Sequence, residues 1–446
     1  MAEPAPEHLL SPEDLKRSLD RGRVGQARRR GRRASLLWLL VGPGMLAMLG
    51  ENDGPSMLSY AASGAIFGIG FFLPFIFLTF GAAMLVQEMA MRVGAVTHRG
   101  YGELIFQRFG PGWGWISIVD LLVTNFVTLI TELIAVRVGM AFFGIPAPLA
   151  VLSGVLLVAF SAAGGRYWRW ERIALGLAAF NLLFLVVAVV SRPDHAQIGW
   201  SLLTWTPLPR GSLQTFLLLA ASNIGATVTP WMIFFQQSAV ADKGLTPRDL
   251  TAGRIDTGLG CVLAALAAGG SLVAAAALFT HHVNPAQFRL GADFARALRP
   301  IIGYPGAAIF ALGLIEAGAL ATMTISASSA YALGEAVAGP HSFNRGVFEA
   351  PGFYLYNVVL AALAGLVVLI PGAPLLSITL NANLLALVLM PAALVFLLML
   401  ANDRELMGPR ANPGWLKALG VLVVAIVGTT GSLYAIVAAY HALAGG

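Results

Sequence analysis

The sequence predicts an all-α polytopic membrane protein with two inverted five-helix repeats and an eleventh span. Three observations support this fold class. Of 446 residues, 57% are hydrophobic and 11% are charged, whereas soluble domains carry about 25% charged residues. The apolar residues form long blocks of roughly 20 residues, the length of a helix that crosses a bilayer. Two blocks, five spans apart, each carry a polar break with Gly and Pro near the middle, which indicates inverted repeats.

The apolar blocks are solidly apolar rather than alternating, which favours helices over barrel strands. Residues 1–34 form a basic leader that we expect to be disordered or loosely helical. Residues 35–401 hold spans one to ten, with repeats at about 35–191 and 212–401, and residues 402–446 hold a loop, span eleven and the C-terminus. The eleven expected spans are 35–63, 66–92, 114–141, 147–164, 172–191, 212–240, 255–280, 301–333, 352–371, 376–401 and 415–443.

Basic residues are concentrated on one side of this predicted bundle. The leader ends in a cluster of arginines next to the first apolar block: Arg28, Arg29, Arg30, Arg32 and Arg33. The positive-inside rule then predicts a cytoplasmic N-terminus and an external C-terminus in a plasma membrane, as in a bacterial inner membrane. We interpret the basic leader as a topology signal that contacts membrane lipid, not as a nucleic-acid-binding segment. The outside segments contain few arginines: Arg192, Arg210, Arg289, Arg296 and Arg299.

The sequence carries no signature of an enzyme. It lacks a Walker motif, a dinucleotide fingerprint and a zinc-hydrolase motif. Cys261 is the only cysteine, so we expect no disulfide framework, zinc cluster or bound cofactor. We expect the chain to act as a monomer. The largest outside segment, 281–300, begins with His281 and His282, which form either a solvated loop end or a pair that captures metal.

The two breaks predict a binding site in the middle of the membrane. The first reads Gly50-Glu51-Asn52-Asp53-Gly54-Pro55-Ser56, and the second reads Gly225-Ala226-Thr227-Val228-Thr229-Pro230. Proline interrupts the helical hydrogen bonds, and the bilayer tolerates the freed carbonyls only where they line a cavity or are buried in protein. A single break could be a packing kink. Because an unpaired carboxylate at this depth costs several kcal/mol, Asp53 needs a cation or a proton.

These residues resemble the Nramp family of divalent metal transporters, which have a LeuT-type fold. Gly42-Pro43-Gly44 precedes Asp53-Gly54-Pro55-Ser56 at the family's spacing, and the second break is similar to the family's Gly-Ala-Thr-Val-Met-Pro-His. Gln87, Arg92, Asn383 and Pro391 also match. The resemblance covers spans one to six best. It implies that residues 35–401 form a transporter core that carries a divalent metal ion by alternating access.

Several residues depart from the family's pattern. Thr229 replaces the metal-binding Met, Trp231 and Gln236 replace two His, and Ala135 replaces the second acid of span three, whose first acid corresponds to Glu132. A thioether is a soft ligand that favours transition metals. Without it, the expected site is all oxygen, which suits Mg²⁺ and also Mn²⁺, as in the Nramp-related magnesium transporters. The expected metal ligands are Asp53, Ser56, Thr229 and Asn383, with carbonyls near Glu51 and Ala226.

The resemblance attributes proton coupling to groups that are mostly missing here, so we expect uncoupled movement of the ion. Three alternatives remain: a proton-coupled Mn²⁺ or Fe²⁺ importer, an organic-solute transporter of the same fold, and a sensor or scaffold that does not transport. The Glu51 side chain supplies a second charge at the site or pairs with a cation such as Arg137. Glu132 and Glu316 are either structural pairs or functional acids.

Overall fold

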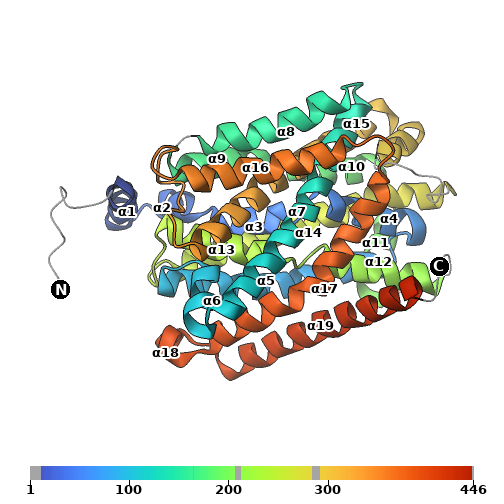
Figure 1. Ribbon diagram of the computed structural model, residues 1–446. Coiled ribbons are helices and arrows are strands. Elements are labelled where there is room, and N and C mark those ends of the chain that lie inside the picture. Colours follow the sequence, from blue (N-terminus) through green and yellow to red (C-terminus); the bar gives the residue numbers. More distant parts are fainter. Residues whose placement is uncertain (1–11, 164, 206–211, 284–291, 444–446) are drawn as a thin grey trace.

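The computed structural model describes residues 12–163, 165–205, 212–283 and 292–443, and its regular structure there is entirely helical (Figure 1). The 3₁₀ turns Ala179–Leu182 and Gly408–Arg410 follow α9 and α18. The helices are α1 Pro12–Arg29, α2 Arg33–Leu40, α3 Pro43–Gly50, α4 Gly54–Phe67, α5 Phe72–Thr97, α6 Tyr101–Phe109, α7 Pro111–Phe142, α8 Ala147–Ala162, α9 Tyr167–Ala178, α10 Leu183–Val190, α11 His195–Thr204, α12 Leu213–Gly225, α13 Pro230–Lys243, α14 Leu250–Thr280, α15 Ala292–Ala336, α16 Pro351–Val368, α17 Leu375–Asn402, α18 Arg404–Met407 and α19 Gly414–Leu443.

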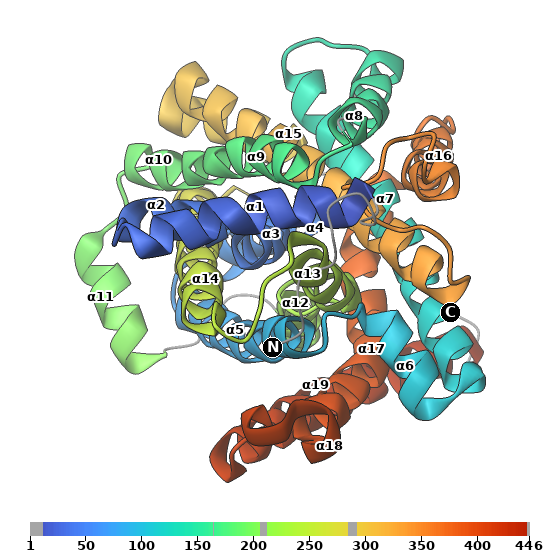
Figure 2. The same cartoon turned by 90° about the vertical axis from the view of Figure 1, so that its left-hand side faces the viewer.

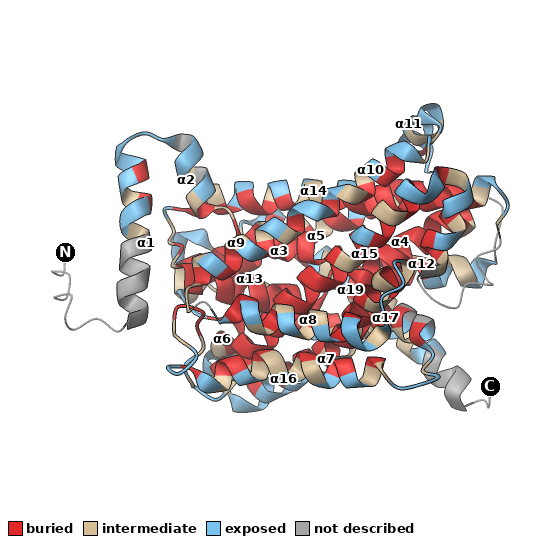
Figure 3. Cartoon of the chain, turned by 90° about the horizontal axis from the view of Figure 1, so that it is seen from above, coloured by how far each residue is buried: buried red, intermediate tan, exposed pale blue. Residues whose placement is uncertain are grey.

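The helices confirm a polytopic membrane protein. Within the described ranges, 9 helical segments are long and apolar enough to cross a membrane, and Ala147–Ala162 is a shorter apolar helix. The first predicted span is divided among α2, α3 and α4, none of which is long enough alone. Buried residues occupy the centre of the bundle, and exposed residues cover its outer faces (Figure 3). Many exposed residues are large and apolar, such as Phe160, Val189 and Leu363, as a lipid-facing surface requires.

Both predicted breaks are present. α3 ends at Gly50 and α4 begins at Gly54, while α12 ends at Gly225 and α13 begins at Pro230. A proline stands in the first turn of α4 and of α13, where its missing N–H costs no helical hydrogen bond. The residues between the helix halves are buried, so the interrupted backbone is enclosed by protein, as the bilayer demands.

Small residues let α14 pack closely against both halves of the first broken span. A Cβ atom added to Gly64 of α4 would lie 2.1 Å from the Leu272 carbonyl oxygen of α14. A Cβ atom added to Gly260 of α14 would lie 2.8 Å from the Met45 Cα atom of α3. Helix interfaces in membranes depend on such close backbone contact. α14 therefore positions both helix halves that flank the first break.

This packing predicts that Gly64→Ala destabilises the protein, because its methyl group would push α4 away from α14. Overpacking of this kind costs about 1–3 kcal/mol, so we expect a lower melting temperature in detergent. Gly176→Ala is the matched control, since a Cβ atom there has nothing within 4 Å. Equal melting temperatures for the two variants would contradict the close contact between α4 and α14.

The leader is helical over most of its described part, since residues 12–29 form α1. α1 lies across one end of the bundle (Figure 2). Arg21 and Arg28 both pair with Asp249, at 2.8 and 2.7 Å, and Val24 is buried beside Val240 and other apolar residues. Of the two states expected for the leader, disordered or loosely helical, this segment adopts the helical one, because its apolar residues find a surface to cover. Residues 1–11 lie outside the described part.

The described C-terminal part of the segment 281–300 is helical. α15 begins at Ala292 and continues to Ala336, with non-helical backbone at Gly303, where φ is 73°. Two helices meet at this kink, and the predicted start of span eight, residue 301, lies two residues before it. Glycine suits this position because side chains disfavour positive φ. Residues 284–291 of the expected loop lie outside the described ranges.

Candidate ion-binding site

The two breaks are joined by direct hydrogen bonds. The Ser56 hydroxyl of α4 donates to the Ala226 carbonyl oxygen at 3.0 Å, and the Tyr60 hydroxyl donates to the same oxygen at 3.2 Å. The Thr229 hydroxyl donates to the Glu51 carboxylate at 2.9 Å. Segments about 170 residues apart in the sequence therefore meet where helical hydrogen bonding is interrupted.

Asp53 occupies the N-terminal end of α4. Its carboxylate accepts a hydrogen bond from the Ser56 backbone N–H at 2.9 Å, and the side chain is almost fully buried. Aspartate is a favoured N-cap because it satisfies a free amide of the first helical turn, and the positive end of the helix dipole also attracts its charge. Asp53 thus caps α4, and its carboxyl group lies at the break beside Glu132.

Three acidic side chains gather at the first break: Glu51, Asp53 and Glu132. All three are buried, and their carboxyl groups interact with one another. Glu132 of α7 accepts a hydrogen bond from the Gly54 N–H at 2.9 Å and also contacts the Asp53 carboxyl group. One oxygen of Glu51 and one of Glu132 have no hydrogen-bond partner among the described residues.

No Lys, Arg or His side chain in the described part of the chain forms an ion pair with these three acids. The proposed pairing of Glu51 with Arg137 is absent, since Arg137 donates to the Val368 carbonyl oxygen. Buried carboxylates without a counter-charge are costly. The cluster therefore has a strong requirement for a cation or for protons.

A metal ion at this position would need more than carboxylates. Among the described residues, no three acidic, His or Cys side chains converge closely enough to hold a metal ion alone. Hydroxyl and carbonyl oxygens from Ser56, Thr229 and Ala226 lie at the same junction. The arrangement offers oxygen donors only, which is the chemistry that hard divalent cations prefer.

Asn383 lies slightly apart from the other predicted ligands. Its amide group is 3.5 Å from the Ser222 hydroxyl of α12, one turn before Ala226. α17 approaches α12 closely here, because a Cβ atom on Gly225 would lie 2.0 Å from the Asn383 carbonyl oxygen. The structure thus brings Glu51, Asp53, Ser56, Ala226 and Thr229 together, and it connects Asn383 to them through the end of α12.

Trp231 and Gln236 occupy the places of the family's two His. Trp231 is fully buried, and its ring is 3.0 Å from where a Cβ atom of Gly50 would stand, so it forms a wall beside the end of α3. Gln236 donates to the Thr257 hydroxyl of α14 at 3.0 Å. Neither side chain has the ionisable group that a proton relay would use.

A polar chain next to the break was missed by the sequence analysis. Asn52 donates to the Asn181 side-chain oxygen at 2.9 Å, and the Asn181 amide donates to both carboxylate oxygens of Glu316 at 3.0 and 3.1 Å. Glu316 was left undecided between a structural and a functional acid. In the sequence, Asn52 lies between the two acids of the first break, and this position could have indicated that it belongs to the site. Nothing in the local sequence marked Asn181.

A second buried polar cluster holds the other end of α3. Asp256 of α14 accepts hydrogen bonds from the backbone N–H groups of Gly42, Gly44 and Met45 at 2.8–3.2 Å. Lys243 pairs with Glu171 at 2.8 Å and donates to the Val41 carbonyl oxygen at 2.8 Å. Charges from α9, α13 and α14 therefore fix the start of the helix half that leads to the acidic cluster.

Comparison with known proteins identifies the family. The model of the family described as "Nramp: Natural resistance-associated macrophage protein-like" matches residues 44–437. The chain is 28% identical over 403 residues to the divalent metal cation transporter MntH 1 of Pseudomonas aeruginosa, covering 86% of this chain and 88% of that protein. It is 27% identical over 398 residues to MntH of Klebsiella pneumoniae strain 342, covering 87% and 91%.

The fold is similar to that of solved transporters. The crystal structure of the Eremococcus coleocola manganese transporter aligns with a TM-score of 0.72 at 20% identity, covering 89% of this chain and 86% of that chain. MhsT in complex with L-phenylalanine aligns with a TM-score of 0.56 at 14% identity, covering 88% and 97%. These neighbours confirm the predicted LeuT-type fold, and with the family match over most of its length, the chain belongs to the Nramp transporter family.

Proposed function

We propose that this chain carries divalent metal ions across the membrane by alternating access, and that its site accepts Mg²⁺ and Mn²⁺ without coupling to protons. The observation that carries the proposal is the set of donors at the two breaks. Glu51 and Asp53 contribute carboxylates, Ser56 and Thr229 contribute hydroxyls, and Ala226 contributes a carbonyl oxygen. The donors lie where the helices are interrupted, the usual place of a transporter's ion site.

The donor type argues for a hard cation. Thr229 stands in place of a thioether and is hydrogen-bonded to Glu51, so it brings an oxygen where the family brings a sulfur. Magnesium keeps several waters and uses one or two carboxylates, while Mn²⁺ accepts the same oxygen ligands. The three carboxyl groups also oppose an anionic organic substrate, which makes the organic-solute alternative less favourable.

The side chains next to the second break favour movement of the ion without protons. Trp231 and Gln236 cannot carry a proton away from the site, because neither ionises. The membrane potential supplies about 2.3 kcal/mol per charge per 100 mV, and a divalent ion gains twice that amount. Inward movement down this potential needs no second ion.

Proton-coupled transport of Mn²⁺ or Fe²⁺ is the second candidate, and specific observations favour it. Glu132 lies in contact with Asp53. In proton-coupled transport, it would accept the proton that moves with the metal ion. The similar proteins are also named divalent metal cation transporters, and the fold neighbour is named a manganese transporter. These names favour manganese over magnesium more directly than the residues do.

Uptake into proteoliposomes, with internal pH recorded in parallel, tests the proposal. We expect saturable Mg²⁺ and Mn²⁺ uptake driven by an inside-negative potential, without acidification of the lumen. Uptake of Mn²⁺ with acidification and without any Mg²⁺ signal would replace the proposal with the proton-coupled alternative. Failure of both ions to move would contradict the proposal and would leave only Fe²⁺ as the ion of the second candidate.

Thr229→Met is expected to shift the selectivity of the site toward soft ions. The thioether would add a soft donor and remove the hydroxyl that binds Glu51, so we expect Cd²⁺ to compete at least about tenfold better against Mn²⁺, a change of about 1.4 kcal/mol. The measurement is inhibition of Mn²⁺ uptake by Cd²⁺. Thr229→Val is the control, because it removes the hydroxyl without adding sulfur. Equal competition in both variants would show that position 229 does not contact the ion.

We infer the orientation and assembly from the sequence. The Lys and Arg distribution supports a cytoplasmic N-terminus and an external C-terminus in the plasma membrane, with a monomeric transporter core at residues 35–401. A single cysteine is added after Gly414 in a Cys261→Ala background. Its reaction with a membrane-impermeant thiol reagent shows on which side of the membrane the start of α19 lies. Labelling of this cysteine from the outside would contradict the inferred orientation, which places the start of α19 in the cytoplasm.

A further inference from the structure

A cavity of about 650 Å³ lies away from the ion site, between α5, α14 and the start of α19. The connection from α17 to α19 closes one side of it. One part of the lining is charged and consists of Glu88, Arg92, Arg254 and Arg410. The other part is apolar and includes Met84, Leu85, Trp415 and Leu416. The cavity is therefore amphipathic, and its charged and apolar linings lie at different positions along α5.

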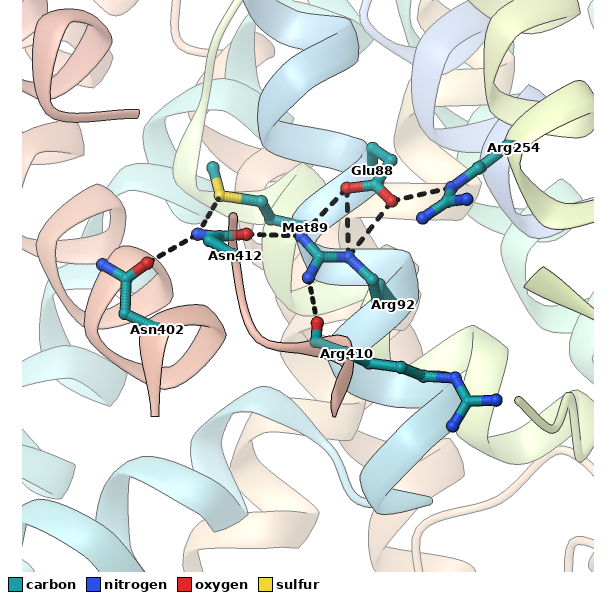
Figure 4. Close-up of polar contacts among 7 residues, drawn as sticks. All are labelled: Glu88, Met89, Arg92, Arg254, Asn402, Arg410 and Asn412. Carbon is teal, nitrogen blue, oxygen red and sulfur yellow. Dashed lines mark hydrogen bonds and ion pairs between the residues drawn. The ribbon is translucent and has the colours of Figure 1, made fainter. Parts of the chain in front are cut away.

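The charged end is built around a buried arginine (Figure 4). Arg92 is 2% exposed, and its guanidinium donates to Glu88, to the Arg410 carbonyl oxygen and to the Asn412 side-chain oxygen. The Asn412 amide in turn donates to Asn402 at 2.8 Å. These bonds hold the connection between α17 and α19 against α5, so the charged end is part of the folded structure.

Two further guanidinium groups at this end remain available to a ligand. Arg254 donates through Nε to Glu88 at 3.0 Å, and its side chain is 53% exposed. Arg410 is exposed, and its side chain extends away from Arg92 (Figure 4). Glu88 is shared between Arg92 and Arg254, and with Arg410 the charged lining holds three guanidinium groups and one carboxylate. A phosphate group matches the excess positive charge, because guanidinium binds phosphate through two parallel hydrogen bonds.

The apolar part extends from this end into the depth of the membrane. Gly81 and Arg92 both line the cavity, and their spacing on α5 corresponds to about 16 Å along the helix axis. Leu259 and Val262 of α14 are half-exposed and continue the apolar surface in the same direction along α14. An acyl chain fits such a groove through van der Waals contact, because lipid tails are as apolar as the side chains that line it.

We propose that this cavity binds one anionic phospholipid. Its phosphate lies between Arg254 and Arg410, and one acyl chain follows α5 past Leu85 and Met84 to Gly81. The charged end faces the side of the membrane that the Lys and Arg distribution predicts to be cytoplasmic, where anionic lipids concentrate. The bound lipid connects α5, α14 and α19 and stabilises their packing.

Native mass spectrometry of the full chain, purified in mild detergent with added phosphatidylglycerol, tests the charged end. We expect one tightly retained lipid on the wild type and about tenfold or greater loss of retention in the double variant Arg254→Gln, Arg410→Gln, which removes two phosphate-binding groups. Arg404→Gln is the control, because Arg404 is exposed in the same connection but does not line the cavity. Equal retention by the double variant and the wild type would overturn the proposal.

A second variant tests the apolar groove. A Cβ atom on Gly81 has nothing within 4 Å, so Gly81→Trp should fill the groove without disturbing the fold, and we expect it to reduce lipid retention while both arginines stay in place. Melting temperatures measured with phosphatidylglycerol, phosphatidylcholine or glycerol phosphate separate the possible ligands. The proposal requires stabilisation by phosphatidylglycerol alone. Equal stabilisation by glycerol phosphate would instead assign a phosphate site, and unchanged retention in Gly81→Trp would exclude the groove.

Discussion

Asp53→Ala is expected to abolish saturable uptake of Mg²⁺ and Mn²⁺ into proteoliposomes. Asp53 is buried at the start of α4, next to Glu51 and Glu132, and its carboxylate faces the gap between the helix halves. Removing a carboxylate ligand from a site that binds a divalent ion removes charge and a donor together. We therefore expect uptake at the level of empty liposomes, at least about a hundredfold below the wild type, which corresponds to about 2.7 kcal/mol.

Asp53→Asn separates the ligand role from the helix-cap role. Asparagine caps a helix as well as aspartate does, so this variant should keep the hydrogen bond to the Ser56 N–H and melt near the wild-type temperature. It lacks the negative charge, so it should still fail to transport. If Asp53→Asn transports normally and Asp53→Ala is merely unstable, the carboxylate acts as a cap and is not an ion ligand.

Lys243→Ala is expected to have the largest effect on stability. The Lys243 and Glu171 side chains are 1% and 0% exposed, and Lys243 also donates to the Val41 carbonyl oxygen at 2.8 Å. Removing one partner of a buried ion pair costs about 3–5 kcal/mol, and among the described residues Glu171 would keep only the more distant Arg172 guanidinium, at 3.9 Å, as an ion-pair partner. We expect a large drop in the melting temperature of the detergent-solubilised protein.

The double variant Lys243→Met, Glu171→Leu distinguishes the lost charge balance from lost packing. Two apolar side chains of similar size replace the pair without leaving a buried charge, and such replacements are often neutral or stabilising. We expect the melting temperature to recover most of the loss. A double variant as unstable as Lys243→Ala would mean that the specific bonds to Val41 and the α3 start, rather than charge balance, stabilise this end.

Asp53→Ala and Lys243→Ala change residues at opposite ends of α3. The acidic cluster lies at its C-terminal end, while Lys243 and Asp256 hold its N-terminal end through Val41, Gly42 and Gly44. Alternating access requires movement of elements around a fixed site. A more stable hold at the N-terminal end therefore favours one access state, and Lys243→Ala should also change the rate of uptake in any fraction that remains folded.

Much of the architecture was predictable because its causes are local. The spans follow from hydropathy, since the bilayer requires long apolar helices with satisfied backbone groups. The breaks follow from Gly, Pro and polar residues within apolar blocks, as at Asp53 and Pro230. For the leader, the sequence left disorder and helix both open, because a helix at residues 12–29 depends on a surface such as that of Val240 and Leu245 to cover Val24.

The sequence by itself determined the number and kind of spans, the position of both breaks and the oxygen-bearing side chain at Thr229. Only the tertiary structure decided which side chains meet. Glu132 reaches Asp53 because α7 presents it to the start of α4, and Lys243 meets Glu171 across 72 residues of sequence. Such contacts depend on how each helix is rotated and packed against its neighbours, which hydropathy does not specify, because a buried helix is apolar on every face.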